Sequence, residues 1–226
     1  FSEESRSILK QLAFGDNKVK RISNENKLLE SEPDMALVPS GFFKMGSSKT
    51  LDDESPEHRV YLDGYWIDKY EVSAGKFAKF LNAVDNIKGY YLDNKFGTLF
   101  YDGRYHPRPS LENYPINNVS WLAADSYCKW KGKRLPTEAE WEKAARGELG
   151  QVYPWGNLAP SDTRARYFKT WTEEEKHKVM MPVQALIEGQ SPYGLHNMAG
   201  NVKEWVDDWY DREYYKEQSE YANPRG

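Results

Sequence analysis

Groups that could bind a metal ion gather in the segment GLHNMAGNVKEW, residues 194–205. Calcium collects about six to eight oxygens from carboxylates, amide side chains and backbone carbonyls. An extended backbone would direct the oxygens of Gly200, Val202 and Glu204 to one side, and Asn197 could add its amide carbonyl across a turn at Gly200. The same letters fit a plain turn in which Glu204 is a solvated charge. From these residues alone the turn is the favoured interpretation, and calcium is the alternative.

Composition excludes several classes of function. The 226 residues carry a formal net charge of −4 without a long run of lysine or arginine, so a nucleic-acid partner is not expected. No apolar run approaches the roughly 20 residues that span a bilayer, so no transmembrane segment is expected. The single cysteine, Cys128, excludes a disulfide framework and a multi-cysteine metal site within this sequence. Aromatic residues make up 15% of the chain, which suits an irregular core rich in loops.

Short elements are expected to position these groups. Residues 1–33 are charged and have helical spacing, which predicts a helical lead-in or linker ahead of a domain over residues 34–226. The letters MALVPSGFFKMGS predict two short strands around a turn at Pro39–Gly41. HRVYLDGYWIDKYEVS predicts further extended segments that break at Asp63–Gly64.

Three helices carry clear signals. Ser73 is the expected N-cap of an amphipathic helix, and a second helix is expected to start near Ser120 and end at Gly132. In RLPTEAEWEKAARG, Thr137 and Glu140 form a capping box. Residues 86–114, rich in Tyr, Gly, Asn and Pro, are expected to form a long irregular loop.

Several motifs occur together in a fixed order: VPSGFFKMGS, ESPEHRVYLDGYWIDKYEVS, GKRLPTEAEWE, YPWGN, SPYGLHNMAGNVKEWVDDWY and NPRG. In this order they resemble the formylglycine-generating enzyme family, also called the sulfatase-modifying factor domain, over about residues 35–226. The resemblance implies an α+β fold of the C-type-lectin-like kind with little regular secondary structure. It also implies that the domain over 34–226 lacks the C-terminal segment of the family.

The resemblance changes the preferred interpretation of the opening segment, because a structural calcium site of the family uses it. Carried over by position, the ligands are Asn197, Gly200, Val202 and Glu204, with Met198 offering its backbone carbonyl. The other calcium site of the family begins at an asparagine, and Arg166 stands in that position here. An arginine cannot coordinate a cation, so this other site is expected to be absent or rebuilt.

Enzymes of the family oxidise a sulfatase cysteine with oxygen and a copper(I) ion held by two cysteines beyond the NPRG motif. The sequence ends at Gly226, so copper is expected only if a cysteine pair follows, and Cys128 has no second thiolate beside it. Lys203 replaces a tryptophan that lines the substrate groove of the enzymes. The favoured hypothesis is therefore a non-catalytic, calcium-stabilised module that binds a protein partner. The alternative is a formylglycine-generating oxidase whose catalytic segment is missing from this chain.

Overall fold

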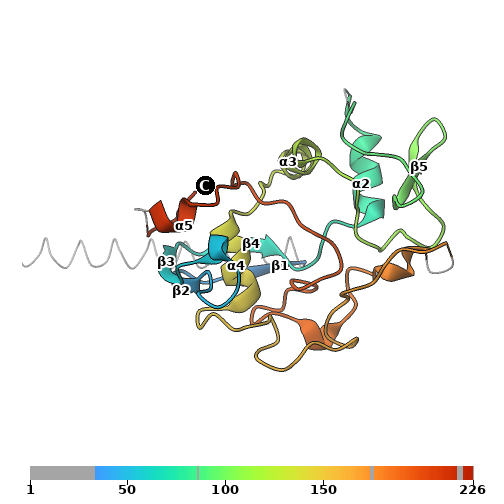
Figure 1. The fold of residues 1–226 in the computed structure, drawn as a ribbon. Coiled ribbons are helices and arrows are strands. Elements are labelled where there is room, and N and C mark those ends of the chain that lie inside the picture. The colour runs from blue at the N-terminus through green and yellow to red at the C-terminus, as the bar shows by residue number, and fades with distance from the viewer. Residues whose placement is uncertain (1–33, 86, 174–175, 218–220, 226) are drawn as a thin grey trace, which may run out of the picture. The chain divides into compact units, whose positions relative to one another are not determined.

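The computed structural model describes residues 34–217, except 86 and 174–175, together with residues 221–225. By its internal contacts the chain divides into two units, Phe1–Met35 and Ala36–Gly226. The helical lead-in predicted for residues 1–33 lies outside the described residues. The second unit consists of short strands and helices joined by long loops (Figure 1).

All of the elements are short. The strands are β1 (Met35–Val38), β2 (Gly41–Met45), β3 (His58–Leu62), β4 (Tyr65–Asp68), β5 (Leu99–Tyr101) and β6 (Tyr105–Pro107). The α-helices are α2 (Ala74–Leu81), α3 (Trp121–Trp130), α4 (Glu138–Arg146) and α5 (Tyr214–Glu217). The described part of the chain also contains three 3₁₀ turns, namely η1 (Asp52–Glu54), η2 (Lys176–Val179) and η3 (Ile187–Gly189).

The strands form three separate pairs. β2 and β3 are antiparallel, with Gly41 opposite Leu62 and Met45 opposite His58, while β1 pairs with β4. The two strands predicted around Pro39–Gly41 therefore exist, but each pairs with a later strand and not with the other. β5 and β6 form a hairpin inside residues 86–114, which corrects the expectation of a wholly irregular loop.

Helix α4 shows why the strongest local signal was reliable. The Thr137 hydroxyl accepts a hydrogen bond from the Glu140 backbone N–H, and the Glu140 carboxylate accepts one from the Thr137 N–H. Both arms of the capping box are therefore present, and Gly147 ends the helix. The fully buried Lys143 donates hydrogen bonds from Nζ to the carbonyls of Pro39 and Gly41. These bonds fasten α4 to the connection between β1 and β2.

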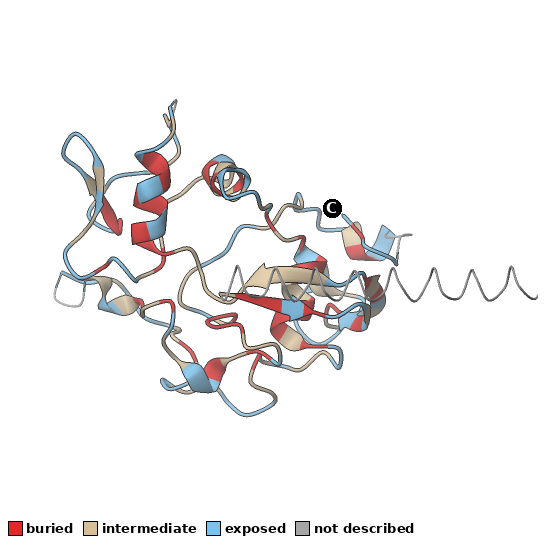
Figure 2. Cartoon of the chain, turned by 180° about the vertical axis from the view of Figure 1, so that it is seen from behind, coloured by how far each residue is buried: buried red, intermediate tan, exposed pale blue. Residues whose placement is uncertain are grey.

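Three apolar clusters form the core, and the longer helices turn buried residues toward it and exposed residues away (Figure 2). One cluster brings β1 and α4 together with Leu195 and Met198 of the later chain. This packing fixes the start of the segment that the sequence singled out. Within the described residues, no helix is long and apolar enough to cross a membrane.

Candidate functional site

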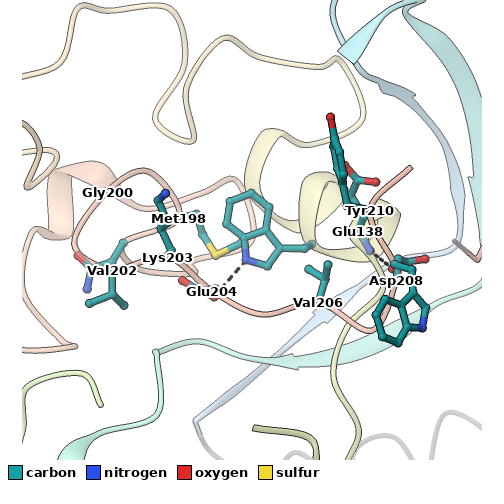
Figure 3. Close-up of a pocket in the computed structure, with 12 residues that line it drawn as sticks. Glu138, Met198, Gly200, Val202, Lys203, Glu204, Val206, Asp208 and Tyr210 are labelled. Carbon is teal, nitrogen blue, oxygen red and sulfur yellow. Dashed lines mark hydrogen bonds between the residues drawn. The ribbon is translucent and has the colours of Figure 1, made fainter. Parts of the chain in front are cut away.

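All five residues predicted to bind calcium line one pocket with a volume of about 430 Å³. The wall contributed by residues 197–204 faces the first turn of α4 and the segment that follows residue 205 (Figure 3). The complete lining is Glu138, Trp141, Asn197, Met198, Gly200, Val202, Lys203, Glu204, Val206, Asp208, Trp209 and Tyr210. The structure thus brings the predicted residues together in one hollow.

The backbone of this segment is bent, which corrects the extended geometry that the sequence argument assumed. Asn197, Gly200 and Asn201 have φ values of 56°, 106° and 63°, in the left-handed region. The bend runs through residues 198–202, and no strand forms there. A Cβ on Gly200 would lie 2.4 Å from the carbonyl oxygen of Arg166, so only glycine fits at this position. The turn and the candidate site are therefore the same feature.

Glu71 anchors the segment from the chain between β4 and α2. Its Oε2 accepts a hydrogen bond of 2.8 Å from Nδ2 of Asn197, and its Oε1 accepts one of 2.9 Å from Nδ2 of Asn201. Asn201 Oδ1 also accepts a hydrogen bond from the Met181 N–H at 2.9 Å. The sequence analysis did not select Glu71 or Asn201. Asn201 stands inside the motif, whereas Glu71 is 126 residues from Asn197 and gave no local signal.

The side-chain oxygen of Asn197 is the strongest sign of a missing ligand. Asn197 is only 4% exposed, and its Oδ1 has no hydrogen-bond partner among the residues that the structure describes. The opposite assignment of the amide is disfavoured, because Nδ2 already donates to Glu71 and to the Val183 carbonyl. A buried acceptor without a partner costs about 1–3 kcal/mol. A cation in the pocket would supply the missing partner.

Two carboxyl groups belong to the surroundings of Asn197: that of Glu71 accepts a hydrogen bond from its amide, and Glu204 lines the same pocket. Burial raises the pKa of Glu71 to about 8, and repulsion from Glu204 adds to the increase. Glu204 keeps exposed surface as a residue, but protein atoms surround its carboxyl group, and this desolvation raises its pKa to about 7. Its Oε2 accepts a hydrogen bond of 3.1 Å from the Trp141 indole N–H (Figure 3). No cationic group of the described residues lowers the pKa of either carboxylate, and a bound cation would lower both pKa values.

The donor set differs from that of a transition-metal centre. Across the described parts of the chain, no group of three or more His, Cys, Asp and Glu side chains could hold a metal ion. A cation at residues 197–204 would depend on amide, carbonyl and carboxylate oxygens, which is the preference of a hard ion such as calcium. These residues fit calcium in chemical type.

Copper does not fit the residues present. Cys128 is half-buried in α3, and burial raises the pKa of its thiol to about 11. It is therefore protonated at neutral pH, and no other cysteine occurs in the sequence to complete a thiolate pair.

Arg166, at the position expected to begin another calcium site, forms an internal contact instead. Its guanidinium donates hydrogen bonds to the backbone carbonyls of Val179, at 3.2 Å, and of Lys178. Its own carbonyl accepts from the Asn201 N–H at 2.8 Å. A positively charged side chain thus faces carbonyl oxygens here and ties η2 to the turn at residues 200–201.

Lys203 lies on the pocket wall and is exposed. Its ammonium group makes no ion pair or hydrogen bond with the residues that the structure describes. The position predicted to differ from the enzymes is therefore open to solvent and to a ligand.

Comparison with known proteins places the chain in a family. The family profile described as "Sulfatase-modifying factor enzyme 1-like domain" matches residues 20–226. The formylglycine-generating enzyme of Mus musculus is 34% identical over 240 residues, covering 85% of this chain and 62% of the mouse protein. The formylglycine-generating enzyme of Thermomonospora curvata is also 34% identical, and the match covers 85% of this chain and 77% of that protein. The serine/threonine-protein kinase Pkn1 of Chlamydia trachomatis is 35% identical over 193 residues, which are 29% of its length.

Solved structures agree on the fold. PvdO from Pseudomonas aeruginosa superposes with a TM-score of 0.62 at 25% identity, covering 83% of this chain and 75% of PvdO. CarF superposes with a TM-score of 0.53 at 21% identity, covering 79% of this chain and 81% of CarF. The expected α+β fold of the formylglycine-generating enzyme type, with little regular secondary structure, is confirmed. The chain belongs to the sulfatase-modifying factor family, whose members include the formylglycine-generating enzymes.

Proposed function

We propose that this domain is a calcium-stabilised module that binds a protein partner. The observation that carries the calcium part is the buried, unpartnered Oδ1 of Asn197, which lies in the same pocket as the carboxylate of Glu204. Calcium bound there would draw on Asn197 and Glu204 side-chain oxygens and on the backbone carbonyls of Met198, Gly200 and Val202. The ion would supply positive charge beside Glu71 and Glu204, whose pKa values no cationic group of the described residues lowers.

The role of such an ion is structural. Residues 197–204 form a bent loop without a strand ladder, and its ends are fixed by core packing at Met198 and by the Trp141–Glu204 hydrogen bond. An ion bound only by the folded loop stabilises the folded state by mass action. Glu71 would support the site from behind, because its carboxylate orients the amides of Asn197 and Asn201.

Glu204→Ala should abolish calcium-dependent stabilisation. At calcium concentrations one hundred times the dissociation constant, the wild-type protein should gain about 2.7 kcal/mol, or about 5–10 °C in Tm. The variant should gain about 1 °C or less, because the ion loses its charged ligand. Thermal melts of chelator-treated protein across a calcium titration measure both values.

Asp85→Ala is a suitable control, since Asp85 is an exposed carboxylate on the loop after α2, and it should respond to calcium as the wild type does. A wild-type protein whose Tm does not change with calcium, and which contains none by elemental analysis, would contradict the calcium site. A full calcium response in Glu204→Ala would place the ion elsewhere.

Catalysis is the second candidate function, favoured by the identity of 33–34% to proteins named formylglycine-generating enzyme. The chain spans 62% of the mouse relative, and its one cysteine has a raised pKa. The full-length protein, loaded with copper(I) and supplied with oxygen, should be assayed for loss of the thiol in a cysteine peptide. Aldehyde formation would establish the oxidase, and its absence in copper-loaded protein would favour the binding module.

A further inference from the structure

The loop that follows α4 has no charged side chain over residues 149–161, although 29% of the chain is charged. This segment is called the uncharged loop below. Three of its aliphatic side chains are exposed, namely Leu149 to 84%, Val152 to 64% and Leu158 to 61%. Exposed apolar side chains that occur singly are normal, whereas several on one short loop indicate an interaction surface. None of the three lines the pocket of the proposed calcium site.

One guanidinium group fixes the base of the uncharged loop. Arg146, the last residue of α4, donates hydrogen bonds to the carbonyls of Gln151, from Nε at 2.8 Å, and of Gly150, from Nη2 at 3.2 Å. The Gln151 N–H donates back to the Arg146 carbonyl at 3.1 Å. The same guanidinium also bonds to the Gly46 carbonyl and to the Glu142 carboxylate. The base of the loop is therefore held in place against α4.

A tight turn forms the tip of the loop. Tyr153 and Gly156 exchange two backbone hydrogen bonds, at 3.0 and 2.9 Å. The rings of Tyr153 and Trp155 are stacked, with their centroids 5.0 Å apart. The Trp155 indole N–H donates to the Leu158 carbonyl at 2.9 Å. Val152 and Leu158 therefore lie on the two arms of one turn, which also carries a pair of aromatic rings.

Many polar backbone groups of the loop already have partners within the protein. In addition to the bonds above, the Val152 N–H donates to Oδ1 of Asn157 at 3.2 Å. The Ala159 carbonyl accepts a hydrogen bond of 3.3 Å from Nη1 of Arg164. An amide that enters an apolar medium without a partner is strongly disfavoured. The existing bonds lower this cost, so the turn is suited to apolar surroundings.

The size of this surface favours lipid over protein as its occupant. A standard protein–protein interface takes about 20–30 residues from each partner. The uncharged loop offers three exposed aliphatic side chains and two partly exposed rings, which is far less. Together these aliphatic side chains are similar in apolar size to one acyl chain, which binds a bilayer weakly and reversibly. Trp and Tyr, the two ring types in the loop, are enriched at the headgroup level of membranes.

The charges around the loop have both signs. Glu148 and Asp162 flank it in the sequence, and Asp162 forms an ion pair of 3.2 Å with Lys169. The guanidinium groups of Arg146 and Arg164 lie against carbonyls of the loop. These flanking charges form no basic cluster, so the surface suits an electrically neutral bilayer better than an anionic one.

We infer that the uncharged loop inserts its tip into the surface of a lipid bilayer. Val152 and Leu158, with Leu149 beside them, would contact the acyl chains, and the rings of Tyr153 and Trp155 would lie at the level of the headgroups. The contact is weak, reversible and independent of anionic lipid. It uses none of the residues of the proposed calcium site, so each proposal can fail without the other.

Vesicle flotation tests this inference with the full chain. Phosphatidylcholine vesicles should float more than half of the wild-type protein at about 5 mM lipid, given an association constant on the order of 10³–10⁴ M⁻¹ for an anchor of this size. The combined variant Leu149→Ser, Val152→Ser, Leu158→Ser should lower that constant at least about tenfold. Addition of anionic phosphatidylserine should not increase the floated fraction.

Ile187→Ser is the matched control, because Ile187 is an aliphatic side chain that is 71% exposed outside the uncharged loop. It should float as the wild type does. All of the replaced side chains are exposed, so the combined variant and the control should each melt within about 2 °C of the wild type. The inference is overturned by a wild type that does not float, or by a combined variant or a control that loses as much as the other.

A fluorescent label measures insertion directly and does not depend on the combined variant. Leu158→Cys and Ile187→Cys should each be labelled with an environment-sensitive nitrobenzoxadiazole group at neutral pH. Burial raises the pKa of the Cys128 thiol to about 11, so Cys128 stays protonated and reacts slowly. On phosphatidylcholine vesicles the label at 158 should emit at shorter wavelength and be quenched by lipids brominated on their acyl chains, and the label at 187 should not.

The remaining outcomes would contradict membrane insertion. Equal emission from both labels would show that the loop stays in water. Flotation on anionic vesicles alone would assign the binding to charged groups outside the loop. A dimer seen by sedimentation in the wild type and lost in the combined variant, without flotation, would assign the loop to a second copy of this chain.

Discussion

Replacing Gly200 by alanine should destabilise the domain by about 3–5 kcal/mol and remove its calcium response. The new Cβ would lie 2.4 Å from the Arg166 carbonyl oxygen, at a backbone φ of 106° that favours glycine. That oxygen cannot withdraw freely, because it accepts the Asn201 N–H bond, and the Arg166 guanidinium is held by the carbonyls of Lys178 and Val179. The clash therefore pushes the loop at residues 197–204 away from the backbone of Arg166, against which it packs.

Gly194→Ala is the matched control for this prediction. Gly194 also has a left-handed φ, 78°, but no atom lies within 4 Å of an added Cβ. The free energy of unfolding of Gly194→Ala should therefore fall by only about 1–2 kcal/mol, which is the cost of the strained backbone conformation. Urea denaturation of both variants gives the two free energies of unfolding, and the difference between them is the steric part. Equal losses would show that the close approach of residues 166 and 200 does not constrain the folded protein.

The sequence predicts the elements whose causes are local. The capping box at Thr137 and the N-caps Ser73 and Ser120 satisfy free backbone groups within one turn, so helices α2, α3 and α4 begin where expected. The β5–β6 hairpin was missed although Asp102–Gly103 is a turn signal, because the two flanking strands are only three residues long and show no apolar alternation. The hairpin is held against the C-terminal end of α2, where the side chain of the C-cap residue Asn82 forms hydrogen bonds with both the N–H and the carbonyl of Tyr105.

In the candidate site, too, the features with local causes were predicted and those that depend on tertiary contacts were not. The five proposed ligands, between Asn197 and Glu204, were carried over from the family resemblance of one short motif, and the structure places all of them on the lining of one pocket. Glu71 and Trp141 were missed because their partnership with this motif is formed only by folding. The bend was foreseen as a turn of asparagine and glycine, but its left-handed geometry and its contact with Arg166 follow from tertiary packing. A single sequence carries no record of that packing.

Calcium affinity should increase with pH, by at least about tenfold from pH 6.0 to pH 8.5. Without the ion, the pKa of Glu71 is about 8 and that of Glu204 about 7, both above their usual value near 4.5. The folded, calcium-free protein therefore holds more protons than the unfolded chain between about pH 4.5 and 8. Its stability from these groups is complete below that window and falls as the pH rises through it.

Calcium reverses this dependence because it binds the charged carboxylates and releases their protons. The increase in Tm on adding calcium should consequently be small at pH 5.5 and large at pH 8.5. Titration calorimetry in two buffers with different ionisation enthalpies counts the protons released per ion. Glu71→Gln keeps an acceptor for the asparagine amides but removes one titrating group, so fewer protons should be released and the affinity should vary less with pH. The same affinity at both pH values in the wild type would show that neither carboxylate is protonated before the ion binds, and that Glu71 is not electrostatically linked to the site.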